Sequence, residues 1–284
     1  MGASRLRRRR ILEVSVRSVR IRVSVVALAL IFGASTVEVA QSAPQANLRY
    51  TFEQGIKTDS QGRKFVGDST GLGHKGFIRT ANGGKINIIA GNGGKTPKFP
   101  NQCEPSPQGS TCPKALIQAK KTNPDDLNPG PEPFSFGADV KIDGESELTL
   151  NGGGMNIVQK GLIDTPGGQW KLQIDSEARP ARPACFVREG GARITATAQG
   201  VDVADNLWHS IECKKDADSL SIWIDNVQRG SKPLGGISVS TTRPVTVGAK
   251  WLPGDPDPNN PQQPLGPIND QFYGALDNVF FSLD

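Results

Sequence analysis

Three carboxylates are the first residues whose spacing suggests catalysis. Asp143, Glu145 and Glu147 alternate with Gly144 and Ser146. On an extended strand they would share one face, where paired carboxylates can act as the acid/base and the nucleophile of a glycosidase. However, Asp143-Gly144 is a residue pair typical of turns. We therefore interpret this segment as an exposed turn.

The two histidines do not complete a nucleophilic site. His74 lies in a glycine-rich segment, and His209 follows Trp208 at the start of an apolar alternation. A structural, hydrogen-bonded histidine is the better interpretation of His209. The sequence contains no Gly-x-Ser-x-Gly, phosphate-binding loop or His-Glu-x-x-His motif. We therefore expect no enzymatic activity.

Aromatic and polar side chains suggest ligand binding instead. Trp223 lies between Ile222 and Ile224, whose side chains we expect to point into the core. Because side chains of a strand alternate in direction, Trp223 should point outward. The same parity exposes further candidates, namely Phe186, Lys171, Gln173 and Ser210. An aromatic ring stacks on the apolar face of a pyranose while polar groups bond its hydroxyls. These residues predict a sugar site, which the proline-rich segment 251–267 could rim. The alternative is that a loop covers Trp223 as part of a satellite core.

Period-2 alternation dominates the segments that must hold these residues. Leu207 to Asp225 reads as a strand, a polar turn and a second strand, followed by the turn pair Asp225-Asn226. Phe134 to Ile142 and Gln169 to Asp175 alternate in the same way. No long stretch has a helical period. The sequence therefore predicts an all-β protein.

Several short motifs resemble laminin-G-like domains. They are Tyr50 to Gly55, Asp68 to Gly71, Asn156 to Gly161, Trp208-His209 with Ile224-Asp225-Asn226, and Phe272 to Val279. The resemblance implies a concanavalin-A-like jelly-roll β-sandwich of two antiparallel sheets over residues 47–284. This fold serves lectins, glycanases and adhesion modules alike. Glycanases of this fold that resemble the β-glucanases use the motif Glu-x-Asp-x-Glu. Residues 143–147 do not have this order.

The resemblance also implies a structural calcium ion. Such domains often hold Ca²⁺ with oxygen ligands from loops and strand ends. Asp68 and Asp277 are the positions that resemble the family's acidic sites, and pairing of the terminal strands would bring them together. The alternative is that Asp68 caps a turn and Asp277 bonds to backbone.

The N-terminus reads as a cleaved signal peptide over residues 1–42. A basic leader precedes the apolar stretch Val23 to Ala34, which is short for a membrane span. A transmembrane anchor is the alternative. The leader holds eight of the 33 Lys and Arg and two of the 28 Asp and Glu, so its removal changes the net charge from +5 to −1. The mature part then shows no nucleic-acid signature, and we expect a secreted protein.

Four cysteines in an exported chain suggest disulfides. The alternation of apolar residues indicates that the Cys185 and Cys213 side chains both point inward, and we expect them to pair across neighbouring strands. Cys103 and Cys112 would then close a small loop. Metal ligation is the alternative, but the sequence has no Cys-x-x-Cys.

Together these features favour an exported, non-catalytic binding module, most simply a lectin-like one with a glycan or cell-surface polysaccharide as its partner. One alternative is a structural or adhesion module with a protein partner at the cell surface. Another is a glycoside hydrolase of the same fold.

Overall fold

The computed structural model describes residues 46–102, 111–119, 127–142, 154–163, 165–174, 180–251 and 268–284. These segments form strands and turns, and none of them is a helix. None therefore provides a long apolar helix that could cross a membrane. Four segments with predicted roles lie outside the described residues, and their roles stay predictions. They are the signal peptide, Cys103, the acidic segment 143–147 and residues 252–267 of the proline-rich segment.

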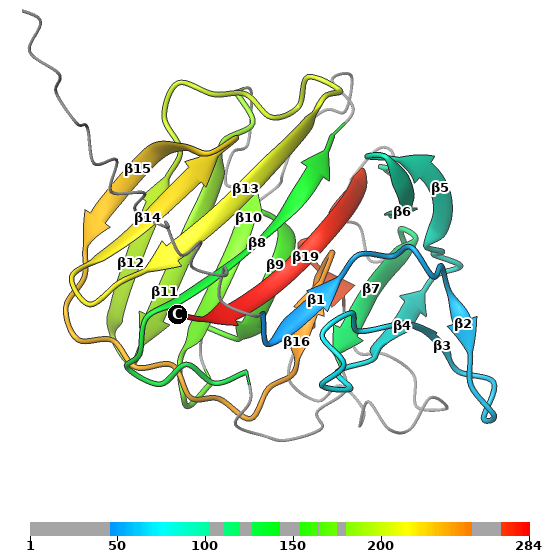
Figure 1. The fold of residues 1–284 in the computed structure, drawn as a ribbon, viewed down its shortest axis with the longest axis horizontal. Helices are drawn as coiled ribbons and strands as arrows, with labels where there is room; N and C mark the ends of the chain where they lie inside the picture. The colour runs from blue at the N-terminus through cyan, green and yellow to red at the C-terminus, as the bar shows by residue number, and fades with distance from the viewer. Residues whose placement is uncertain are drawn as a thin grey trace, which may run out of the picture. The chain divides into compact units, whose positions relative to one another are not determined.

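Two antiparallel sheets make up the fold (Figure 1). Sheet A has the strand order β15-β14-β13-β8-β19-β6-β5, and β1 also pairs with β19. Its strands are β1 (Leu48–Tyr50), β5 (Asn87–Gly91), β6 (Gly94–Lys98), β8 (Phe134–Lys141), β13 (Trp208–Lys215), β14 (Ser219–Ile224), β15 (Val227–Pro233) and β19 (Ala275–Leu283). Strands distant in sequence are thus neighbours, as in a jelly roll.

Sheet B has the strand order β12-β11-β10-β9-β16-β7-β4-β3-β2. Its strands are β2 (Lys57–Thr58), β3 (Lys64–Val66), β4 (Gly76–Ala81), β7 (Lys114–Ala119), β9 (Met155–Gly161), β10 (Gln169–Ile174), β11 (Pro183–Glu189), β12 (Ala192–Thr197) and β16 (Val245–Val247). A separate pair, β17 (Lys250–Trp251) and β18 (Ile268–Asn269), forms a short ribbon.

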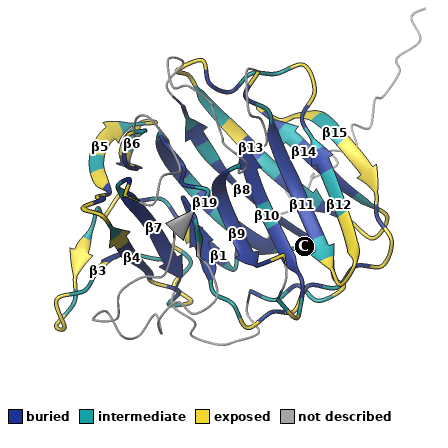
Figure 2. Cartoon of the chain, turned by 180° about the vertical axis from the view of Figure 1, so that it is seen from behind, coloured by how far each residue is buried: buried dark blue, intermediate teal, exposed yellow. Residues whose placement is uncertain are grey.

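The core lies between the two sheets and matches the predicted alternation. Trp170 on β10 is fully buried, with its ring centroid 4.7 Å from that of Phe136 and 5.1 Å from that of Phe281. The predicted inward residues of both alternating runs belong to this core, namely Phe134, Phe136, Ala138, Val140, Ile142, Trp170, Leu172 and Ile174. Figure 2 shows buried residues along β9 and exposed residues along β15 at the edge of sheet A.

The predicted hairpin is confirmed. Strands β13 and β14 pair in register, with Cys213 opposite Ile222 and both in the core. Asp225 and Asn226 have φ angles of 51° and 63°, the left-handed backbone that the following turn requires. This hairpin carries Trp223, His209 and one of the cysteines.

Candidate functional site

The four predicted ligand residues do not share one surface, which corrects the prediction. Trp223 lies on β14 of sheet A, whereas Lys171 and Gln173 lie on β10 and Phe186 on β11 of sheet B. Each points away from the core, so Trp223 is on one side of the sandwich and the other three are on the opposite side. A period of two tells which face a residue occupies, but not which sheet its strand joins.

The three residues on sheet B do not form an open aromatic platform. Phe186 faces Lys171 across the strand pair, and the Lys171 ammonium lies 4.8 Å from the ring centroid. The Arg193 guanidinium lies 5.0 Å from the same centroid. Phe186 is therefore only 3% exposed, and Gln173 is also buried. These cation–π contacts stabilise the ring but leave it little surface for a ligand.

Trp223, by contrast, is half-buried on the outward face of sheet A. Its indole N–H donates to the Ser221 hydroxyl oxygen at 3.0 Å, and the Lys214 ammonium lies 5.2 Å from its ring centroid. Glu212 is directly opposite Trp223 on β13 and forms a 3.1 Å ion pair with Lys214. The ring is thus held in place by its edge and by one cation while part of it faces solvent. The predicted Ser210 is exposed on the same strand as Glu212.

A second ring, which sequence reasoning missed, shares this face. Phe280 on β19 is half-buried and lies outside the core, with the Arg49 guanidinium 5.6 Å from its centroid. It pairs with Gly137 on β8, where an added Cβ would lie 2.9 Å from the Phe280 ring and 2.2 Å from the Ile211 carbonyl oxygen. Glycine at 137 therefore lets the Phe280 ring lie over β8.

Register places these groups in one line across sheet A. The paired residues run from Trp223 to Glu212, Gly137, Phe280 and Arg49. Because the Phe280 ring lies over β8, roughly two strand spacings, or about 10 Å, separate it from β14. We call Trp223, Phe280, Glu212, Lys214 and Arg49 the open aromatic face. It offers two apolar ring surfaces with a carboxylate and an ammonium group between them.

The signal for Phe280 was present but ambiguous. Val279, Phe280 and Phe281 are three consecutive apolar residues. Because neighbouring side chains of a strand point to opposite faces, at least one of the three must point away from the core if only one face is buried. The register of β19 shifts between Asp277 and Phe280, and Val279 and Phe281 both enter the core. This bulge, which parity cannot reveal, selects Phe280 as the outward residue.

Asp68, the first predicted calcium ligand, is bound by donors from its own neighbourhood. Its carboxylate accepts hydrogen bonds from the Thr70 backbone N–H and hydroxyl, the His74 N–H and the Arg49 N–H, at 2.8–3.3 Å. These bonds fix the turn after β3. The residue thus fits the turn-capping alternative and fits poorly as a metal ligand.

Asp277, the second predicted ligand, lies directly opposite Asp139 on the outward face of sheet A. The Asn92 amide donates to both carboxylates, at 3.1 Å and 2.9 Å. Burial raises the pKa of Asp277; the nearby charges of Asp139 and Glu53 add to this effect, whereas its hydrogen bonds oppose it. No contact joins Asp277 to Asp68. Within the described ranges, no group of three His, Cys, Asp or Glu side chains is arranged to hold a metal.

His209 is structural in the way that its position suggested. Its Nδ1 lies 2.8 Å from Asp225 Oδ2 and its Nε2 lies 3.1 Å from Asp205 Oδ1. Burial lowers the pKa of His209, but the two carboxylates outweigh this effect and raise the pKa above its ordinary value. Both ring nitrogens are therefore engaged in tying β13 to its flanking turns.

The predicted disulfide between Cys185 and Cys213 is confirmed, with a Cα–Cα distance of 5.8 Å. Its placement differs from the prediction: β11 belongs to sheet B and β13 to sheet A, so the bridge crosses the core rather than joining neighbouring strands. Cys112 is also disulfide-bonded. Because Cys103 lies outside the described residues, the pairing of Cys103 with Cys112 stays a prediction.

Comparison with known structures gives the same fold at low sequence identity. The binding domain of Paraclostridial Mosquitocidal Protein 1 matches 84% of this chain and 49% of its own length, with a TM-score of 0.53 and 12% identity. The binding domain of Botulinum neurotoxin DC matches 84% of this chain and 48% of its own, with a TM-score of 0.51 and 12% identity. This chain therefore spans about half the length of these toxin binding domains.

A domain of similar size also matches. Domain 4 of AbnA, an extracellular arabinanase from Geobacillus stearothermophilus, aligns over 84% of this chain and 93% of its own, with a TM-score of 0.54 and 14% identity. No curated protein matches. The family model of the laminin G domain matches residues 186–284, which hold β13, β14 and β19. Residues 186–284 are therefore similar to the laminin G domain, and the described residues have the jelly-roll fold of these binding domains.

Proposed function

We propose that this chain is an exported, non-catalytic module that binds carbohydrate through the open aromatic face of sheet A. The observation that carries this proposal is the pair of half-buried rings, Trp223 and Phe280, aligned on one sheet face. The predicted signal peptide supports export.

The chemistry of the face suits an oligosaccharide. Aromatic rings contact the C–H-rich faces of sugar rings, and charged or polar groups bond the hydroxyls. Glu212 supplies acceptors and Lys214 supplies donors between the two rings. Because the Phe280 ring lies about two strand spacings from β14, the strand that carries Trp223, a ligand longer than one sugar ring suits contact with both rings. An extended glycan therefore fits better than a monosaccharide.

Structures of the same fold support a binding role. One is a binding domain of Botulinum neurotoxin DC in complex with SialylT, and the AbnA domain is in complex with arabinotriose. Another complex of the neurotoxin domain contains rat synaptotagmin II, a protein. That complex favours a second candidate function for this chain, an adhesion module with a protein partner.

A glycan array with the chain lacking residues 1–42 tests the proposal, followed by titration calorimetry with the best glycan. Saturable binding is expected, and Trp223→Ala and Phe280→Ala should each weaken it at least roughly tenfold, or about 1.4 kcal/mol. Leu207→Ala, at an apolar residue that is 61% exposed, is the matched control and should bind normally.

Thermal or urea unfolding of the same variants separates a platform from a core residue. A platform Trp223 should leave stability nearly unchanged after substitution by alanine, whereas a buried tryptophan would cost roughly 3–5 kcal/mol. Unchanged stability together with unchanged glycan binding would reject the site. No binding to any glycan would favour the protein-adhesion alternative.

A further inference from the structure

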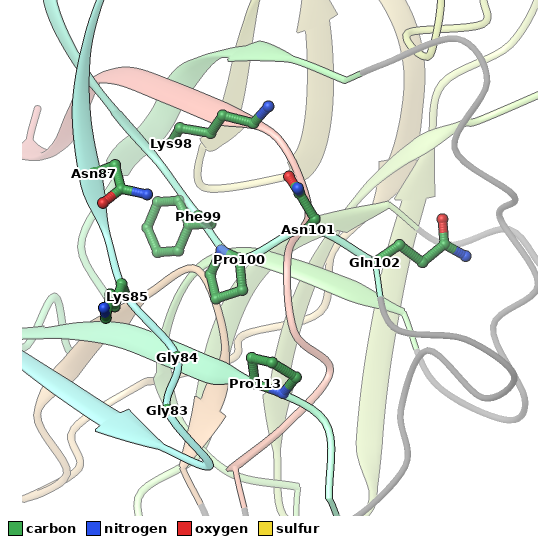
Figure 3. A pocket seen from close by; sticks show the side chains of 10 residues that line it. All are labelled: Gly83, Gly84, Lys85, Asn87, Lys98, Phe99, Pro100, Asn101, Gln102 and Pro113. Carbon is green, nitrogen blue, oxygen red and sulfur yellow. The ribbon is translucent and has the colours of Figure 1, made fainter.

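A pocket lies beside β5 and β6, the strands at the far end of sheet A from Trp223 (Figure 3). Its volume is about 580 Å³, within the range of roughly 300–1,000 Å³ that is typical of small-molecule sites. The side chains that matter for its chemistry are Lys85, Asn87, Lys98, Phe99, Pro100 and Asn101. None of them belongs to the open aromatic face.

The walls of the pocket are fixed by backbone packing. An added Cβ at Gly84 would lie 2.1 Å from the Lys114 carbonyl oxygen, so this wall fits tightly against β7. Next to it, the Asn82 side-chain amide donates to the Cys112 carbonyl oxygen at 3.0 Å. On the other side, the Phe99 N–H donates to the Gly274 carbonyl oxygen at 2.9 Å. The pocket is therefore preformed rather than made by one mobile side chain.

The lining carries positive charge without a compensating acid. Lys85 and Lys98 both line the pocket, and no Asp or Glu is among the described lining residues. Neither lysine forms an ion pair with any residue that the structure describes. Two uncompensated ammonium groups around one concave surface favour an anion, whose charge they would balance.

The remaining groups favour a hydroxylated ligand. The Asn87 and Asn101 side chains have no hydrogen-bond partner among the described residues, so both amides are available as donors and acceptors. Phe99 and Pro100 also line the pocket, but both are buried and Phe99 belongs to the core, so they form the pocket floor and expose little apolar surface. Phe99 is anchored by an edge-to-face contact with Phe272 at 5.8 Å. Positive charge and amide groups thus surround one space above a rigid floor.

We infer that this pocket binds a sugar acid: a ring with several hydroxyl groups and one carboxylate. The lysine ammonium groups would attract and bind the carboxylate, and the asparagine amides would bind hydroxyls. The inference is independent of the proposed glycan platform, because the two sites share no residue.

Titration of the chain lacking residues 1–42 with D-glucuronate, followed by NMR or calorimetry, tests this inference. Saturable binding of D-glucuronate is expected, with at least roughly tenfold weaker binding of D-glucose and of acetate. The first control removes the charge, and the second removes the hydroxyl-bearing ring. Equal binding of acetate and D-glucuronate would overturn the sugar-acid assignment.

Variants locate the site. Lys85→Glu with Lys98→Glu should abolish D-glucuronate binding, and Asn87→Ala should weaken it. Lys232→Glu, which reverses an exposed charge on β15, should change nothing. A loss of D-glucuronate binding in Trp223→Ala, with normal binding in the double lysine variant, would refute the pocket and assign the ligand to the open aromatic face. Circular dichroism of each variant verifies that it is folded.

Discussion

The bridge that crosses the core between Cys185 and Cys213 should account for a large part of the stability of this domain. Both residues are fully buried, and they are separated by 28 positions in the sequence. In the chain-entropy description, closing a loop of that length in the unfolded chain contributes about 3.6 kcal/mol to stability at 25 °C. The bridge also links sheet A to sheet B, so its loss removes a covalent restraint between the two layers.

The test is urea unfolding of the Cys185→Ala/Cys213→Ala variant against the parent. We expect a decrease of about 3–4 kcal/mol in the free energy of unfolding. For a domain of this size, each kcal/mol lowers Tm by about 2–4 °C, so the expected decrease is about 6–16 °C.

A matched experiment separates the cross-link from lost packing. In a Cys103→Ala/Cys112→Ala background, reductant can act only on the Cys185–Cys213 bridge and leaves both sulfur atoms in place. Its effect should equal most of the loss seen in the alanine variant. A loss below about 1 kcal/mol in both experiments would refute the loop-entropy reasoning.

Two further predictions concern charged groups. Because its folded pKa is raised, protonated His209 should contribute stability that is complete below its unfolded pKa near 6.5 and is lost as pH rises through the folded pKa. Melting curves between about pH 6 and pH 8.5 should therefore show a decline that His209→Gln lacks, and an identical pH dependence in both proteins would contradict the role of Asp205 and Asp225. The calcium prediction is tested at Asp277: millimolar Ca²⁺ should raise Tm and Asp277→Asn should remove the response, whereas no response of the parent would count against calcium.

The sequence predicted the local structure of this protein well. Alternation of apolar and polar residues defined the hairpin that carries Trp223 and the inward set around Trp170, and the tertiary structure confirms both. Inward parity also identified Cys185 and Cys213 as partners. These predictions succeeded because the side-chain direction in a strand depends only on its own period of two.

The candidate sites depended on what that period cannot encode. Strand pairing over long sequence separations decided that Phe186 lies on sheet B and Trp223 on sheet A, which divided one predicted site between two faces. A register shift in β19 turned Phe280 outward, and Gly137 made room for its ring. Local alternation thus showed which side chains of a regular strand leave the core, but not which residue leaves it at a bulge. Which outward side chains meet depends on the order of strands within each sheet, and no local pattern encodes that order.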